Sequence, residues 1–279
     1  MSTTRRKALL LGLAFAATTS TITQPAFAQS ATQSLAQESV IETIKQDGVL
    51  RIGLSVFKPW SMRDKNGELI GFELDVGRAL AEDMGVDVEF IPTAWDGIIP
   101  QLVSGNFDVI ISGMSITPER NLTVNFSDPY AFSGQTILAN KDLTEGLTLE
   151  DYNSPDVTFS ARRGANPATV IASLFPEAEL LLFDEEAAAV QEVLNGNAHA
   201  TMFAEPAPSI EARRYPDKLH VPFDRTFLAT GEGFALRKGD PDALNFFNNW
   251  IASRTASGWL KERNDYWFKG DDWQSEVAE

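Results

Sequence analysis

A serine- and glycine-containing segment with an arginine close behind offers the clearest binding chemistry in this sequence. The almost wholly apolar run 107–112 ends in Ser112 and Gly113, and Ser115 and Arg120 follow. Ligands of open α/β sheets bind beyond the carboxyl ends of the strands. There Gly113 leaves the backbone accessible, and Ser115 offers a hydroxyl and an amide. The planar guanidinium of Arg120 suits a carboxylate; a surface ion pair is the alternative role for this side chain.

A second candidate anion site lies in the middle of the chain. Asn166-Pro167 has the pattern of a helix N-cap followed by proline, and it predicts a helix that runs to about Phe175. The exposed amides at the start of such a helix attract anions. Arg162 and Arg163 end the preceding predicted strand, and a solvated surface position is the alternative for both arginines.

The usual signatures of catalysis and metal binding are missing from the sequence. The chain has no cysteine, which excludes disulfides, iron–sulfur clusters, thiolate zinc sites and a cysteine nucleophile. The two histidines, His199 and His220, do not have the spacing of metal ligands. There is no G-x-S-x-G elbow and no P-loop, and Gly231-Glu-Gly233 lacks the third glycine and the helix of a dinucleotide loop. These patterns give no signal for a catalytic residue, a metal or a cofactor.

Composition limits the class of protein and its partners. The 279 residues are 43% hydrophobic and carry a formal net charge of −16, which indicates a globular chain rather than a disordered one. The acidic balance argues against nucleic acid and against anionic lipid as partners. The length is typical of one large domain or of two lobes.

The N-terminus has the pattern of a secretory signal peptide. Basic residues at 5–7 precede a ten-residue apolar run, 8–17, and Ala26-Phe27-Ala28 forms an A-x-A cleavage site. A transmembrane anchor is the alternative, but spanning a bilayer takes about 20 apolar residues. We expect cleavage after Ala28, export to the periplasm by the general or the twin-arginine route, and a polar leader over 29–38.

The body of the chain alternates predicted strands with predicted helices. We expect strands at 49–54, 88–91, 107–112, 157–161, 180–183 and 198–203, and helices at 72–84, 96–104, 166–175, 185–194, 241–250 and after Gly258. The segment 102–111 is echoed by 193–202, since each has a helix end, a Gly-Asn turn and an apolar strand. This echo predicts two similar α/β lobes. From Gly270 the sequence is polar and acidic.

Several short segments carry a resemblance to a known family. They are Leu50–Gly53, Gly71–Val76, Trp95–Leu102, Gly105–Arg120, Phe126–Tyr130, Ser133–Gln135 and Gly233–Gly239. Together they closely resemble the amino-acid-type periplasmic solute-binding proteins of ABC importers, and the resemblance spans about residues 49–268. It implies an α/β, two-lobed fold of the periplasmic-binding-protein type II, with hinge crossovers near 133–141 and 228–234.

The resemblance also implies a domain organisation and a function. Lobe 1 would comprise 39–135 and 231–270, lobe 2 would comprise 136–230, and 271–279 would be a tail. The chain would bind an amino acid or a derivative between lobes that close on it. It would then deliver this ligand to an ABC permease in the inner membrane, as a monomer.

The family's binding residues can be carried over to matching positions of this sequence. In relatives, the residues matching Ser115 and Arg120 hold the α-carboxylate, and the backbone at Ser112 and Gly113 receives the α-amino group. The further positions that the resemblance implies are Phe57 and Trp95, whose rings would sandwich the ligand, Arg162, which would reach its side chain, and Asn166, at the carboxylate-binding helix start. Trp60 is a further aromatic candidate for this pocket, but packing in the core is its expected role.

One position departs from the family pattern. Many relatives have an acidic residue that pairs with the α-ammonium where this sequence has Ala204. Glu205 would take over this role if the turn shifts, and an exposed turn residue is the alternative. If neither residue serves, a ligand without a free α-ammonium, such as an opine or a quaternary amine, is expected.

Two other functions remain open at this point. Cyclohexadienyl dehydratases resemble these binding proteins, and such an enzyme would need a general acid in the cleft, for which Glu205 is the candidate. A sensory solute receptor would use the same closure to signal to a partner. The sequence does not identify the ligand.

Overall fold

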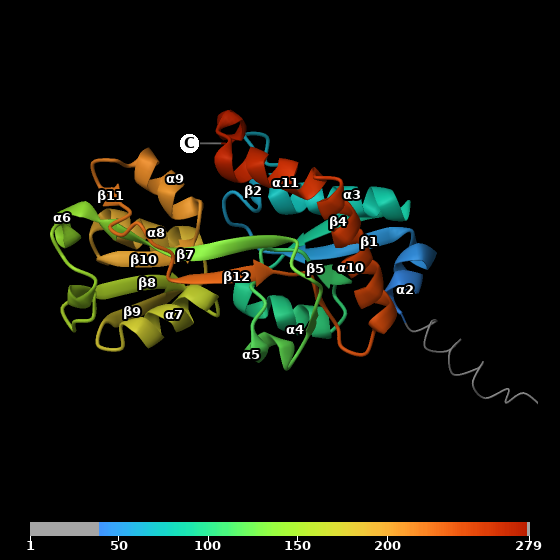
Figure 1. Cartoon of the computed structure of the whole chain (residues 1–279), viewed down its shortest axis with the longest axis horizontal. Helices are drawn as coiled ribbons and strands as arrows, with labels where there is room; N and C mark the ends of the chain where they lie inside the picture. The colour runs from blue at the N-terminus through green and yellow to red at the C-terminus, as the bar shows by residue number, and fades with distance from the viewer. Residues whose placement is uncertain (1–38, 278–279) are drawn as a thin grey trace, which may run out of the picture.

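The computed structural model describes residues 39–277, in which two large β-sheets have helices packed against them (Figure 1) and a third sheet has only the two strands β2 (Met62–Arg63) and β3 (Leu69–Ile70). The predicted signal peptide and leader lie outside the described residues. The alternation of strands and helices confirms the mixed α/β class. Within 39–277, no helix is both long enough and apolar enough to cross a bilayer.

The first sheet has the strand order β4-β1-β5-β13-β6. Its strands are β1 (Val49–Leu54), β4 (Asp87–Pro92), β5 (Val109–Ile110), β6 (Asn125–Phe126) and β13 (Ala235–Leu236). The elements around it are α2 (Val40–Asp47), β2 (Met62–Arg63), β3 (Leu69–Ile70), α3 (Phe72–Met84), η1 (Trp95–Gly97), α4 (Ile98–Val103), α5 (Pro118–Asn121), α10 (Pro241–Ala256), α11 (Trp259–Asn264), η3 (Asp265–Lys269) and η4 (Asp272–Glu276). Because β1 and β5 are parallel, their carboxyl ends share one edge of the sheet.

The second sheet has the order β11-β7-β10-β8-β9, and β12 also pairs with β7. Its strands are β7 (Ala131–Asn140), β8 (Thr158–Arg162), β9 (Glu179–Phe183), β10 (Ala200–Ala204), β11 (Leu219–His220) and β12 (Leu228–Glu232). Its helices are α6 (Lys141–Thr144), η2 (Glu150–Tyr152), α7 (Asn166–Leu174), α8 (Glu186–Asn195) and α9 (Ala207–Arg214).

Two strands connect the halves of the molecule. β7 and β12 run antiparallel, with Ala131 opposite Glu232 and Gln135 opposite Leu228. Figure 1 shows this pair extending from the first sheet into the second. The chain therefore enters the second half along β7 and returns along β12, so that both connections pass through one ribbon.

Local sequence patterns explain several element boundaries. Helix α3 spans the predicted residues 72–84, and it ends at Gly85, whose φ of 68° is in the left-handed region. Asp240 caps α10 as predicted, because its side chain accepts from the backbone N–H of Ala243. The two echoed turns also match: Gly105 and Gly196 have φ values of 81° and 75°.

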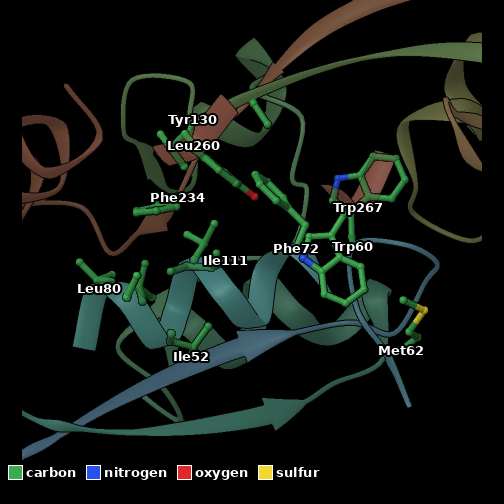
Figure 2. Packing of buried hydrophobic residues seen from close by; sticks show 14 of the residues in the cluster. Ile52, Trp60, Met62, Phe72, Leu80, Ile111, Tyr130, Phe234, Leu260 and Trp267 are labelled. Carbon is green, nitrogen blue, oxygen red and sulfur yellow. The ribbon is translucent and has the colours of Figure 1, made fainter. Parts of the chain in front are cut away.

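Apolar side chains from distant parts of the chain form the core of the first half. Figure 2 shows Ile52 of β1, Leu80 of α3 and Ile111, which follows β5, among the packed residues. Trp60 is fully buried there (0% exposed), as predicted for a core residue. The loop that carries Trp60 is thus held in place by packing.

Two predictions about elements need correction. The predicted strand 107–112 is only two residues long, because β5 pairs just at Val109 and Ile110. The predicted tail packs on the first half: Trp273 is 2% exposed, and its ring lies 5.9 Å from that of Trp267. The segment 271–277 was predicted to be a tail because most of its residues are polar or acidic, and its one aromatic residue, Trp273, is buried.

Candidate functional site

A small cavity lies between the two halves, next to the connecting strands. It is lined by Gly113 and Ser115 from the first half, by Asn166 from the second, and by Gln135 and Glu232 from β7 and β12. Its volume is about 30 Å³, well below the roughly 300–1,000 Å³ of a small-molecule pocket. A ligand therefore reaches these side chains only when the halves move apart.

The structure brings most of the predicted site residues together at this cavity. Those that line it are Phe57, Trp95, Gly113, Ser115, Arg120, Arg162 and Asn166. They come from loops at the carboxyl edge of the first sheet and from the segment that joins β8 to α7. The sequence therefore identified both walls of the cavity.

Two predicted residues do not line the cavity. Ser112 is fully buried beneath it, and its hydroxyl oxygen accepts from the backbone N–H of Ser55 at 2.9 Å. The Glu205 carboxylate accepts from the hydroxyl of Ser209, one turn into α9, at 3.0 Å. Ala204 is the residue of this turn that lines the cavity. Glu205 therefore does not line the cavity in this geometry, and its pairing with an α-ammonium stays a prediction.

Arg120 reaches across the boundary between the halves. Thr117 caps α5 by accepting from the backbone N–H of Arg120, which orients this residue. The guanidinium donates to the carbonyl oxygen of Ser115 at 3.0 Å and to that of Gly164, in the second half, at 3.3 Å. Burial, together with the charge of Arg162, lowers the pKa of Arg120 to about 10. The side chain stays charged at neutral pH and can pair with an anion.

Asn166 faces this arginine from the start of α7. The backbone of Ala165 is extended and occupies the N-cap position, so Asn166 is the first helical residue and not the cap that we predicted. Its Nδ2 is buried and has no hydrogen-bond partner within 39–277. Pro167 has no N–H, and the N–H of Ala168 is bonded to the carbonyl oxygen of Ala165 at 3.1 Å. The donor that the start of α7 offers to an anion is therefore the side-chain amide of Asn166.

Arg162 fills the space beside the two aromatic rings. Its guanidinium carbon lies 4.4 Å from the ring centroid of Trp95 and 5.0 Å from that of Phe57. The rings themselves are 6.3 Å apart at 76° to each other. They therefore form a corner, in which Phe57 stacks on Trp60 at 4.9 Å, and the sandwich around a ligand stays a prediction.

Three carboxyl groups near the cavity were missed by the sequence analysis: Glu73 and Glu232 are buried, and Glu186 is half-buried. Glu232 accepts from the indole N–H of Trp60 at 3.0 Å and from Ser133, and Glu186 lies 3.9 Å from Arg162. Glu73 sits deeper, where it accepts from the backbone N–H of Gly113 and from the hydroxyl of Tyr130, both at 2.7 Å.

Burial raises the pKa of all three carboxyls, and the charge of Glu232 raises that of Glu73 further. Neither Glu73 nor Glu232 pairs with a cationic side chain in the described part of the chain. In the sequence, Glu232 stands between Gly231 and Gly233. This pattern was compared only with a dinucleotide-binding loop, so the acid itself was not predicted as a site residue. An uncompensated acid in a cleft wall is suited to a cationic group of a ligand.

Comparisons with known proteins find relatives along most of the chain. The model of the family described as bacterial extracellular solute-binding proteins, family 3, matches residues 50–270. L-cystine-binding protein TcyJ of Escherichia coli K12 is 30% identical over 242 residues, which cover 86% of this chain and 90% of that protein. Cyclohexadienyl dehydratase of Pseudomonas aeruginosa is 27% identical over 236 residues, with coverage of 84% and 88%.

A solved structure gives the same picture. It is that of a proposed ABC-transporter binding component from Wolinella succinogenes, complexed with lysine. The TM-score is 0.77 and the identity 39%, with 82% of this chain and 99% of that chain covered. Two of these three relatives are named for binding and one for catalysis.

Proposed function

Because the chain belongs to family 3 of the bacterial extracellular solute-binding proteins, we propose that it is the substrate-binding component of an ABC importer for an amino acid or a closely related molecule. The observation that carries this proposal is the meeting of Arg120 with the start of α7. A half-buried guanidinium on one half donates to Gly164 on the other, and the unpartnered side-chain amide of Asn166 lines the same cavity. Together they make a carboxylate site that is complete only when the halves are closed.

The α-ammonium of the ligand is assigned to Glu232. Ala204 has no charge to offer, and the carboxylate of Glu205 is turned toward α9. Glu232 is 1% exposed, lines the cavity and is bridged through its backbone to Ser115. A carboxylate has about four acceptor sites, so its bonds to Trp60 and Ser133 leave room for an ammonium.

Because the carboxylate site takes Arg120 from one half and the start of α7 from the other, the ligand binds both lobes at once when they close. We assign 39–135 and 231–270 to lobe 1 and 136–230 to lobe 2, with β7 and β12 as the hinge. When the lobes close, the ligand's charges leave water, and their pairing with Arg120 and Glu232 strengthens. The closed monomer would then be recognised by a permease. This role fits export to the periplasm with removal of residues 1–28, which the N-terminal sequence of the purified mature protein would test.

Thermal unfolding with a panel of ligands tests the binding function. A ligand at a thousand times its Kd adds about 4 kcal/mol to the stability of the folded protein. For a chain of this size that is a shift on the order of 10 °C. We expect such a shift from one or more α-amino acids, and we expect Arg120→Ala to abolish it. No shift from any amino acid or N-substituted amino acid would reject the proposal.

Dehydration of a cyclohexadienyl substrate is the second candidate function. The observation in its favour is Glu186, a half-buried acid at the cavity whose pKa is raised by burial, which is the direction of shift that suits a general acid. Glu186 thereby replaces Glu205 as the candidate acid. Incubation with prephenate or arogenate separates the two functions: binding without product supports transport. Turnover that Glu186→Gln abolishes would support the enzyme.

A further inference from the structure

Arg162 is a buried cation with hydrogen-bonding capacity to spare. Its side chain is 5% exposed, and its Nε has no partner within the described residues. Nη1 donates to the hydroxyl of Ser55 at a long 3.3 Å, and Nη2 lies 3.9 Å from the Glu186 carboxylate, beyond hydrogen-bond distance. The N–H groups of a guanidinium with this degree of burial are normally hydrogen-bonded to well-placed acceptors.

The two nitrogens of Arg162 that lack a hydrogen bond, Nε and Nη2, lie along one edge of the guanidinium. This edge can donate two parallel hydrogen bonds to a single carboxylate. The side chain lines the cavity together with Arg120, whose guanidinium lies 5.4 Å from the same Trp95 ring. Two guanidinium groups thus converge on one small space. A ligand with a single carboxylate satisfies one of them.

We propose that Arg162 binds a second carboxylate of the ligand, so that the protein selects amino acids that carry two carboxylates over neutral and cationic ones. This inference rests on the proposed function, and it names the ligand class of that site. The second carboxylate can stand on the side chain, as in glutamate, or on the nitrogen, as in an N-carboxyalkyl amino acid.

The corner formed by Trp95 and Phe57 supports the same selection, because it excludes cationic ligand side chains. In cation–π recognition, a ligand cation lies over the face of an aromatic ring. Here the guanidinium of Arg162 already lies over Trp95 and Phe57. A lysine or arginine side chain would have to displace this buried group, and it would meet the charges of both Arg162 and Arg120. Cationic ligands are therefore disfavoured by this chain's own arginine.

Matched ligands give the direct test. Calorimetric titration of the mature protein would compare L-glutamate with L-glutamine, which differ in one charged group and have almost the same shape. N-(1-carboxyethyl)-L-alanine, compared with L-alanine, tests the placement on nitrogen, and L-lysine and L-arginine test exclusion. We expect at least one diacid to bind ten times or more tighter than its matched monoacid, and both cationic ligands to bind more weakly than that diacid.

Substitutions assign the preference to Arg162. Arg162→Met retains apolar contact with the rings and removes the charge, so the preference for the diacid is expected to disappear and lysine binding to improve. Arg163→Met is the matched control, because Arg163 is the next residue, is exposed and pairs with Asp184; it should leave the preference intact. A preference that survives in Arg162→Met would overturn the proposal.

A second variant, Glu186→Gln, tests the proposal independently of whether Arg162→Met folds. If Arg162 serves only to pair with Glu186, then Glu186→Gln should disturb the site as much as loss of the arginine does. If Arg162 binds the ligand, removal of this competing anion should leave diacid binding unchanged or tighter. Equal binding of glutamate and glutamine to the wild type, with N-(1-carboxyethyl)-L-alanine no better than alanine, would reject the ligand class while leaving amino-acid binding in place. Absence of binding to every ligand would reject the proposed function itself.

Discussion

The indole N–H of Trp95 donates to the carbonyl oxygen of Gly164 at 3.1 Å, across the boundary between the two halves of the molecule. Arg120 donates to the same oxygen. The carbonyl oxygen of Gly164, just after β8, therefore accepts two hydrogen bonds from the opposite half. Separation of the two halves would break both bonds, so their strength contributes to the affinity for any ligand that requires closure.

Replacing Trp95 by Phe tests this contribution. The substitution keeps an aromatic face near Arg162 and removes the interlobe hydrogen bond. A neutral hydrogen bond contributes about 0.5–1.5 kcal/mol net, so a two- to tenfold loss of affinity is expected in a calorimetric titration. Trp259→Phe, in α11 and outside the residues that line the cavity, is the control and should bind like the wild type.

Asn166→Ala should act on stability and on binding in opposite directions. The Nδ2 of Asn166 is buried without a partner, and such a group costs about 1–3 kcal/mol. Its removal is expected to raise the unfolding temperature of the protein measured without added ligand. The same change removes a donor from the carboxylate site and weakens binding. Asn249→Ala, on an exposed face of α10, should change neither quantity by much; a loss of stability in Asn166→Ala would contradict this account.

Glu232→Gln should weaken binding of ligands that carry an ammonium group. The amide keeps the shape of the carboxyl and can still accept from Trp60 or Ser133. It loses the charge, and a charge-assisted hydrogen bond contributes about 1.5–3 kcal/mol, so the Kd is expected to rise tenfold or more. Glu73→Gln is the matched control: Glu73 is as deeply buried but does not line the cavity. Equal losses in the two variants would mean that the effect comes from packing and not from contact with the ligand.

The same two carboxyls make stability depend on pH. Because burial raises the pKa of Glu73 and Glu232 above the ordinary value of 4.5, the folded chain holds their protons more tightly than the unfolded chain. Their contribution to stability therefore falls as the pH rises from about 4.5 through the folded-state pKa values. In urea unfolding, the double variant Glu73→Gln/Glu232→Gln should gain more stability over the wild type at pH 8 than at pH 5. A gain of the same size at both pH values would count against the raised pKa values.

Local patterns carried the sequence-based predictions that succeeded. The boundaries of α3 follow from an apolar stripe and a terminal glycine, and the start of α10 follows from Asp240. The first wall of the cavity was predictable because Ser115 and Arg120 are close in sequence. Such features depend on neighbouring residues, and one sequence is sufficient to recognise them.

The features that escaped prediction depend on contacts between distant segments. Glu232 is placed by Trp60, which lies 172 positions away, and by its bridge to Ser115. Arg162 enters the aromatic corner because the two halves meet there, which no pattern around β8 reveals. The direction of the Glu205 side chain is set by one bond to Ser209.

The packing of the C-terminal segment provides a last prediction of this long-range kind. Trp273 is 2% exposed, and Val277 forms a bridge to Asp64, so 271–277 should stabilise the first half. Trp273→Ala is expected to cost about 3–5 kcal/mol, as for other buried aromatic residues, and to lower the unfolding temperature by on the order of 10 °C. Trp273→Phe should cost much less, since the indole N–H has no partner in 39–277. If both variants unfold at the wild-type temperature, the segment is a loose tail, as its composition first indicated.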